Sequence, residues 1–289
     1  MDFRTDLALE KHELIRDSAP QGVTSSQYKK CGIGFTKICV TDDIGSKALG
    51  KPIGTYITAE VPPLSIYSPV DENIITALAD ELRGLLPKDG AVLAVGLGNT
   101  DITPDAVGPK SISMLLATRH LSRELIKSTG LSGLRPTAGL ITGVMGKTGI
   151  ESAESIKGIV NTIRPSAVIV VDALAARRLS RLGNTIQISD TGISPGSGVG
   201  NARADISNYT IGVPVISIGI PTVVDAQTLV NDLIGNNAEI SDKESQEMIV
   251  TPREIDLLID RASRLIGLTI NKALQPQLSV DDIIMLVGS

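Results

Sequence analysis

Short, uninterrupted apolar runs alternate with longer amphipathic segments from the middle of the chain to its C-terminal part. Apolar runs of this length are typical of strands covered on both faces, whereas apolar residues at helical spacing are typical of helices. The predicted strands cover residues 91–98, 137–144, 166–174 and 213–220. The predicted helices cover residues 110–130, 151–164 and 252–274. This alternation predicts an α/β domain with a mostly parallel central sheet flanked by helices.

Two stretches fit this pattern poorly. Residues 40–70 contain turn signals and short β-rich pieces, and residues 236–250 are expected to form a polar surface connection. Neither stretch is a clear linker, and no repeat or low-complexity tract divides the chain. Because 289 residues are enough to bury one large core, we expect a single domain.

The composition excludes several classes of protein. A net charge of −5 gives no general attraction to nucleic acid or to acidic membranes. The N-terminal segment has no apolar signal core, and no apolar run is long enough to span a bilayer. Cys31 and Cys39 are too few for a disulfide scaffold, and two histidines, His12 and His120, disfavour a conventional zinc site. We expect a soluble, cytoplasmic protein without direct nucleic-acid binding or membrane association.

Two glycine-rich loops follow predicted strands, where phosphate-binding loops often lie. Residues 143–149 (GVMGKTG) lack the first glycine of the P-loop pattern, which Ile141 replaces. Residues 96–101 (GLGNTD) lack the third glycine of the dinucleotide-binding pattern, which Asp101 replaces. A tight turn between strand and helix explains each loop at least as well. A phosphate- or nucleotide-binding enzyme therefore remains only an alternative.

Two aspartates lie at the ends of apolar runs that we predict as strands. Asp105 lies in the turn after residues 91–98, and Asp172 ends the most apolar part of residues 166–174. In open parallel sheets, the carboxyl ends of strands form the crevice where ligands bind. Two close carboxyl groups cannot both ionise easily, so such a pair can act as acid and base, or can hold a metal that activates water. On spacing alone, an aspartate at a junction of strand and helix is more often a helix cap, and that alternative stays open.

A glycine- and serine-rich segment, DTGISPGSGVGN, covers residues 190–201. Its composition is typical of a loop whose backbone amides approach a ligand or an oxyanion. Ser194 and Ser197 would act as nucleophiles only with a nearby base, and neither histidine lies in a motif with them. A serine hydrolase with a histidine base is therefore disfavoured.

Seven blocks, in this order along the chain, resemble the bacterial germination protease family, also called spore proteases. They are RTDLALEKHE, GLGNTDITPDAVGP, GVMGKTGIESAE, VDALAAR, DTGISPGSGVGN, VPVISIGIPTVVDA and MIVTPREID. The resemblance runs from residue 4 to about residue 275 and covers nearly the whole chain.

This resemblance implies an aspartic-type endopeptidase that degrades small acid-soluble spore proteins during germination. The two essential aspartates of the family lie in blocks that match Asp105 and Asp172 here. The resemblance also implies an inactive precursor, a homotetramer, a location in the forespore and spore core, and no cofactor.

The implied fold is phosphorylase/hydrolase-like and is shared with hydrogenase maturation proteases. Those proteases bind metal at a similar acidic turn, but their site also uses a histidine, for which this sequence has no counterpart. We therefore expect no metal, and a metal-dependent hydrolase with the same two aspartates remains the alternative.

The N-terminus contains a match to the cleavage pattern that the resemblance implies, an acidic residue followed by an aliphatic residue and Ala. The sequence Asp6-Leu7-Ala8 fits this pattern, so we predict autocleavage between Asp6 and Leu7. Residues 1–6 would then be the propeptide and residues 7–289 the single peptidase domain. The local alternative is that Thr5 or Asp6 simply caps a helix that continues to residue 15.

Backbone amides of the glycine-rich loops are the expected substrate contacts. The residues to which we assign this role are Gly98, Asn99, Gly196 and Gly198. An acidic substrate side chain also requires a cationic partner, and Arg203 or Lys147 is the candidate for that partner.

Overall fold

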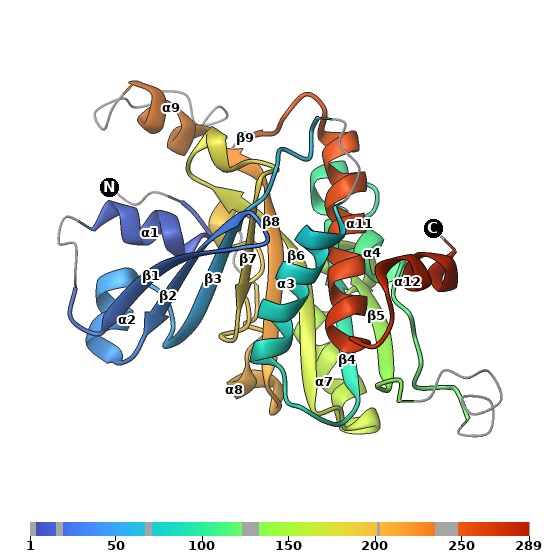
Figure 1. Cartoon of the computed structure of the whole chain (residues 1–289). Helices are drawn as coiled ribbons and strands as arrows, with labels where there is room; N and C mark the ends of the chain where they lie inside the picture. The colour runs from blue at the N-terminus through green and yellow to red at the C-terminus, as the bar shows by residue number, and fades with distance from the viewer. Residues whose placement is uncertain are drawn as a thin grey trace.

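A single mixed β-sheet forms the centre of the computed structural model, which describes residues 4–15, 20–66, 71–122, 133–200, 203–234 and 248–288 (Figure 1). Among these residues the sheet has nine strands in the order β1-β2-β3-β7-β8-β6-β4-β5, with β9 paired to β8. The strands are β1 (Val23–Lys30), β2 (Ile33–Val40), β3 (Gly54–Glu60), β4 (Val92–Leu97), β5 (Thr137–Gly143), β6 (Ala167–Ala176), β7 (Thr185–Ser189), β8 (Val215–Asp225) and β9 (Ile249–Val250).

The sheet has a parallel half and an antiparallel half. Strands β8, β6, β4 and β5 run parallel to one another. Strands β1, β2, β3 and β7 pair antiparallel with their neighbours, and β7 joins the two halves by pairing antiparallel with β8. The predicted α/β class with a central sheet flanked by helices is confirmed. The expectation of a mostly parallel sheet describes the half built from β4, β5, β6 and β8, whereas β1, β2, β3 and β7 make the whole sheet mixed.

Helices cover both faces of this sheet. They are α1 (Ala8–Leu14), α2 (Asp43–Leu49), α3 (Glu72–Leu85), α4 (Val107–Ser113), α6 (Met145–Thr148), α7 (Ser152–Ile163), α8 (Asn208–Ile211), α9 (Ala226–Ile234), α11 (Ile255–Leu274) and α12 (Val280–Val287). Three short 3-10 turns are η1 (Thr103–Asp105), η2 (Leu179–Arg181) and η3 (Ser197–Val199).

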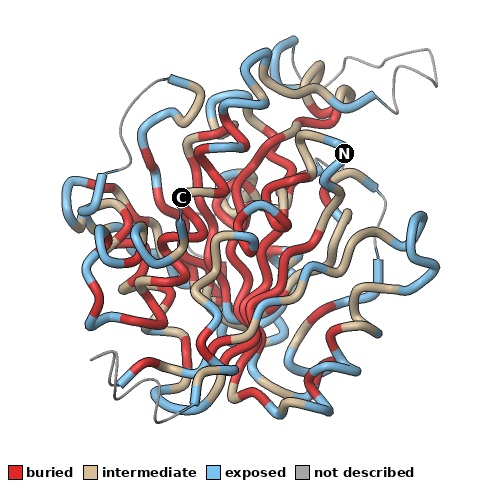
Figure 2. The backbone as a smooth tube through the Cα atoms, turned by 90° about the vertical axis from the view of Figure 1, so that its right-hand side faces the viewer, coloured by how far each residue is buried: buried red, intermediate tan, exposed pale blue. Residues whose placement is uncertain are grey.

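Three apolar layers hold these helices on the sheet. Helices α3, α4, α11 and α12 pack in the largest core, on one face, and α7 and α8 pack on the opposite face of the parallel half. Helices α1 and α2 pack against strands of the antiparallel half. The buried chain accordingly concentrates in the central strands, with exposed segments around them (Figure 2). In the part of the chain described, every helix is too short or too polar to cross a membrane.

The apolar pattern placed the parallel strands correctly because these strands are covered on both faces. In β6, nine of the ten residues are buried, as expected for a central parallel strand rich in Val and Ala. Helix α7 begins at Ser152, where the side chains of Glu151 and Glu154 form a reciprocal capping box. The predicted strand at 166–174 and helix at 151–164 are therefore confirmed within two residues at each end.

The predicted helix over residues 110–130 is wrong over residues 114–122. Helix α4 ends at Ser113, because the buried side chain of Asn271 takes over the next backbone groups. Its amide donates to the carbonyl of Met114 at 2.8 Å and accepts from the N–H of Leu116 at 2.8 Å. A tertiary contact thus replaces the continuation of the helix, and residues 123–130 lie outside the described residues. His120, expected in the middle of this helix, instead lies exposed in a turn.

Three further segments differ from the expectation or were left unassigned. Strand β8 continues past residue 220 to Asp225, because Val223 and Val224 pair with the end of β6. Within residues 40–66, the described part of the unassigned stretch, the chain forms α2 and β3. Most of the connection expected at residues 236–250 lies outside the described residues, and Ile249–Val250 within it forms β9.

Gly108 allows the start of α4 to approach β4 and β6 closely. A Cβ atom at this position would lie 2.1 Å from the carbonyl oxygen of Leu97 and 2.6 Å from that of Val171. Both obstacles are backbone atoms within strands, so they cannot rotate away. This close approach places the turn η1, just before α4, beside β6.

We expect Gly108→Ala to destabilise the protein by about 1–3 kcal/mol, because the new methyl group overlaps backbone atoms. The matched control is Gly158→Ala in the exposed middle of α7, where a Cβ meets no atom within 4 Å. That substitution should stabilise the protein by about 0.5–1 kcal/mol, since it restricts the unfolded chain. Urea unfolding of the two variants measures both effects, and equal stabilities would contradict the packing described for Gly108.

Candidate active site

Asp105 and Asp172 line the same cavity at the carboxyl end of the parallel strands. Asp105 ends the 3-10 turn η1 that follows β4, and Asp172 lies within β6, opposite Gly219 of β8. The cavity has a volume of about 470 Å³. The structure therefore brings together the two carboxyl groups that the sequence selected.

The fold gives neither aspartate the role of a helix cap. The cap position of α4 is Ala106, one residue after Asp105. Asp172 is followed by four more residues of strand β6, up to Ala176, rather than by a helix. Neither Asp105 nor Asp172 therefore occupies a helix-cap position, so helix capping does not explain why an aspartate lies at either place.

The backbone of the turn after β4 fixes Asp105. Its N–H donates to the carbonyl of Ile102 at 2.9 Å, and its own carbonyl accepts from the N–H of Asn99 at 3.1 Å. Pro104, directly before Asp105, lies within the first turn of η1, where proline is tolerated. The carboxyl group is half-buried and faces the cavity.

Burial and mutual repulsion set the protonation of the pair. Burial raises the pKa of Asp105 to about 6, and a hydrogen bond from the Asn99 backbone opposes this shift. Asp172 is 6% exposed, and its pKa is raised well above the usual value by burial first, then by the negative charges of Asp105 and Asp6. The N–H of Ala173 donates to its Oδ1 at 2.9 Å. The surroundings therefore disfavour ionisation of both carboxyl groups, and more strongly that of Asp172.

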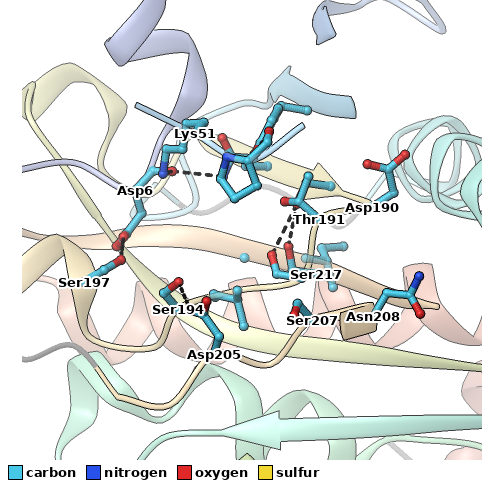
Figure 3. Close-up of a pocket in the computed structure, with 18 of the residues that line it drawn as sticks. Asp6, Lys51, Asp190, Thr191, Ser194, Ser197, Asp205, Ser207, Asn208 and Ser217 are labelled. Carbon is cyan, nitrogen blue, oxygen red and sulfur yellow. Dashed lines mark hydrogen bonds between the residues drawn. The ribbon is translucent and has the colours of Figure 1, made fainter. Parts of the chain in front are cut away.

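The N-terminal segment runs along β6 beside these aspartates. The N–H of Asp6 donates to the carbonyl of Ala175 at 2.9 Å, as in a short strand pairing. Its carboxylate accepts from the N–H of Ala175 at 2.8 Å and from the hydroxyl of Ser197 at 2.9 Å (Figure 3). Asp6 lines the cavity that contains Asp105 and Asp172 as well as a neighbouring cavity of about 760 Å³.

The residues after Asp6 are deeply buried. Leu7 is fully buried and packs in a small cluster with Leu174, Ala176 and Val224. Helix α1 starts at Ala8 with Leu7 at its cap position, so the alternative that Thr5 or Asp6 caps this helix is not observed. The Thr5 hydroxyl instead accepts from the N–H of Leu7 at 3.1 Å.

Two buried anchors hold α1 against the end of β6. The carboxylate of Glu10 accepts from the backbone N–H groups of Arg177 at 2.6 Å and Arg178 at 2.9 Å. The side chain of Gln187 accepts from the N–H of Ala8 at 2.7 Å. Arg4, before the buried stretch, pairs with Asp225 at 3.0 Å. The segment around Asp6 is therefore fixed on both sides.

The four loop residues expected to bind substrate lie around these carboxyl groups. Gly98 and Gly196 line the cavity, and Asn99 contacts Asp105 through its backbone. Gly198 leaves room for Asp6, because a Cβ at this position would lie 2.2 Å from Oδ2 of Asp6. Their location fits the expectation, and their role in binding remains a prediction.

The cations proposed to meet an acidic substrate side chain have other contacts. Lys147 forms an ion pair with Asp101, which joins the two glycine-rich loops considered as phosphate sites. Arg203 lines the cavity, and its guanidinium lies 3.9 Å from the sulfur of Met145. The acidic side chain that does occupy the site, Asp6, is bound by an amide and a hydroxyl instead.

Sequence reasoning missed two residues, Lys51 and Gln187. The Lys51 Nζ donates to the carbonyl oxygen of Asp6 at 2.8 Å, and the Gln187 Nε2 donates to the same oxygen at 3.2 Å. Lys51 follows α2 in the unassigned region, and no motif contains it. Gln187 lies between two isoleucines of a buried strand, and a buried amide in such a strand could have indicated a specific partner.

Metal ligands do not gather in this part of the molecule. Among the residues that the structure describes, no group of three or more His, Cys, Asp or Glu side chains could hold a metal ion. His120 is exposed, and Cys31 and Cys39 are free thiols.

Comparisons with known proteins match nearly the whole chain. A family model described as germination protease matches residues 4–238. The germination protease of Clostridium tetani is 42% identical, with 98% of each chain covered, and that of Caldanaerobacter subterraneus is 43% identical, with 96% of each covered. A solved NiFe hydrogenase maturation protease from Thermococcus kodakarensis is 16% identical, with a TM-score of 0.37 over 66% of this chain and 98% of that one.

We expect Asp172→Asn to stabilise the protein at neutral and alkaline pH. The raised pKa means that the native state binds the Asp172 proton more tightly than the unfolded chain does, so stability falls as pH rises above the unfolded pKa. Asn keeps the acceptor for Ala173 and cannot ionise, so the gain should reach about 0.5–2 kcal/mol at pH 8 and vanish near pH 4.

Urea unfolding from pH 4 to pH 8 measures this difference. The matched control is Asp101→Asn in the exposed turn after β4, where pairing with Lys147 lowers the pKa of the carboxyl. This control should not gain stability as pH rises. The wild type should lose more stability than Asp172→Asn between pH 4 and pH 8. An equal or smaller loss in the wild type would contradict the raised pKa of Asp172.

Proposed function

The chain belongs to the germination protease family, and we propose that it is an endopeptidase whose catalytic pair is Asp105 and Asp172. Its membership makes the chain a protease, and the roles of the two aspartates are our proposal. The observation that carries it is the position of Asp6, which lies in one cavity with both carboxyl groups. A peptide segment of the chain itself therefore lies in the same cavity as the two carboxyl groups.

The protonation of the pair assigns a role to each member. Ionised Asp105 takes a proton from a water molecule as the water oxygen attacks the carbonyl carbon. Protonated Asp172 gives its proton to the leaving nitrogen as the C–N bond breaks. The pair ends the cycle with one proton, now on Asp105, and transfer of this proton between the carboxyl groups restores the starting state.

We further propose that the chain is a precursor that cuts itself between Asp6 and Leu7. The sequence around this bond fits the implied pattern, and the structure holds Asp6 on β6 beside the dyad. The contacts of the Asp6 carboxylate with Ala175 and Ser197 account for a preference for an acidic residue before the cut bond. Residues 1–6 would be the propeptide, of which residues 1–3 lie outside the described residues.

The wider role follows from the family. We propose that the substrates in trans are small acid-soluble spore proteins, that the chain acts in the forespore and spore core, and that it assembles as a homotetramer. The support is similarity to germination proteases over nearly the full length of the chain.

Substitution of either aspartate should leave the N-terminus intact. We expect Asp105→Asn and Asp172→Asn to slow the loss of residues 1–6 by roughly 10²–10⁴-fold, because each removes one proton-transfer step. Mass spectrometry of the incubated full chain reads the N-terminus directly, and Asp101→Asn, in the same turn, is the control that should process normally. Unchanged cleavage in either variant would refute the role of that aspartate. Cleavage that a chelator abolishes and a divalent ion restores would favour the metal-dependent alternative.

The rate of autocleavage should depend on pH with an acid limb near pH 6. Asp105 must be ionised to accept a proton, and its pKa is raised to about 6. Below this value the rate should fall about tenfold per pH unit, and at higher pH it should fall again when Asp172 loses its proton. Time courses from pH 4.5 to pH 9 test this assignment. A rate that stays constant down to pH 4.5 would show that Asp105 is not the base.

A further inference from the structure

The carbonyl oxygen of Asp6 is held by two donors that come from the antiparallel half of the sheet. Lys51, just after α2, approaches this oxygen with its Nζ at 2.8 Å, and Gln187 of β7 approaches with its Nε2 at 3.2 Å. Figure 3 shows the Lys51 side chain directed at Asp6 on one wall of the larger cavity. This carbonyl belongs to the Asp6–Leu7 peptide bond.

Gln187 also fixes the other side of this bond. Its Oε1 accepts from the N–H of Ala8 at 2.7 Å, while its Nε2 donates to Asp6. One buried amide thus binds a residue on each side of the Asp6–Leu7 bond. These two contacts of Gln187 keep the Asp6 carbonyl oxygen close to both donors, Lys51 and Gln187.

The register of the sheet places Gln187 in one row with Asp172. Gln187 of β7 pairs with Gly219 of β8, and Gly219 pairs with Asp172 of β6, so the three residues form one row on one face of the sheet. Neighbouring strands lie about 4.8 Å apart, so the two ends of the row are roughly 10 Å apart at the backbone. The middle residue has no side chain. The row therefore has a carbonyl-binding side chain at one end and an acid at the other.

We propose that Lys51 and Gln187 form the oxyanion-binding pair for the bond that Asp105 and Asp172 hydrolyse, an inference that rests on the proposed function. Attack of water on the Asp6 carbonyl carbon breaks the C=O π-bond and leaves a negative charge on the oxygen, where both donors already lie. Donors placed before the reaction stabilise this charge without reorganisation.

The surroundings of Lys51 make this stabilisation specific for the transition state. Burial lowers the pKa of the Lys51 amine, and the nearby Asp6 charge opposes this shift only in part. The ammonium is therefore poorly solvated while the carbonyl is neutral. Its interaction with the oxygen strengthens when the oxygen becomes charged, and only such a difference accelerates the chemical step.

The same contacts would also result if Lys51 and Gln187 merely anchored the N-terminal segment. Oxyanion binding and anchoring predict different effects of a substitution on Leu7 and Ala8. The N–H group of Leu7 donates to Thr5, and that of Ala8 donates to Gln187. Removal of a residue that only binds the oxyanion leaves the N-terminal segment in its place. Removal of an anchor releases the segment and exposes the Leu7 and Ala8 amides to solvent.

The test measures two quantities on the full chain, the rate of Asp6–Leu7 cleavage and the hydrogen exchange of the Leu7 and Ala8 amides. We expect Lys51→Met to slow cleavage by about 100-fold with exchange protection unchanged, and Lys51→Arg to recover part of the rate, since it keeps a charged donor. Gln187→Glu keeps the acceptor for Ala8 but loses the donor to Asp6, so it should also slow cleavage with protection retained. The control is Lys47→Met, on the exposed side of α2.

Three results would overturn the proposal. Lys51→Met and Gln187→Glu could both cleave close to the wild-type rate, or both could lose protection at Leu7 and Ala8 together with activity, which would make the residues anchors. Lys51→Arg could also be no faster than Lys51→Met while the segment stays seated. Urea unfolding confirms that each variant is folded. Failure of the proposed function is distinct, because in that case Asp105→Asn and Asp172→Asn would cleave like the wild type.

Discussion

A carboxyl group inside a buried central strand of the sheet is the constraint on which the site depends. Asp172 lies in β6 between apolar neighbours, and ionisation there would leave a poorly solvated charge. The strand offers it one backbone N–H, from Ala173, and otherwise favours the protonated form. Asp105 is less deeply buried and its pKa is raised only to about 6, so two identical side chains differ in how readily they ionise.

Strand β6 also organises the peptide segment that lies before the pair. Asp6 pairs with Ala175, and Glu10 binds the amides of Arg177 and Arg178 just past the end of the strand. Asp172 and the docking positions of the N-terminal segment therefore belong to one continuous piece of backbone. Their relative placement is set by strand geometry rather than by loops, which gives the site its precision.

The sequence predicted the parts of this site that are local or that follow from parallel strands. Asp105 and Asp172 could be selected because each follows or ends an apolar run, and such ends meet at one edge of a parallel sheet. The resemblance to a known family then raised them above the capping alternative. Lys51 and Gln187 were missed, because they come from the antiparallel half and reach the site only through tertiary contacts. The end of α4 was missed for a similar reason, since a side chain distant in sequence, Asn271, determines it.

The burial of Leu7 has a consequence for the direction of the proposed self-cleavage. Cutting the bond before it would create an amino group with a pKa of about 8 in water inside the apolar cluster of Leu174, Ala176 and Val224. On the other side, Asp6 would gain a second carboxylate next to a site that already carries Asp105 and Asp172. The new amino group would lie in an apolar cluster, and the new carboxylate would lie beside other acidic groups, so both new ends would be unfavourable where the intact chain held them. The released peptide would therefore be expelled and the new N-terminus displaced, which makes religation improbable and the cut a one-way step.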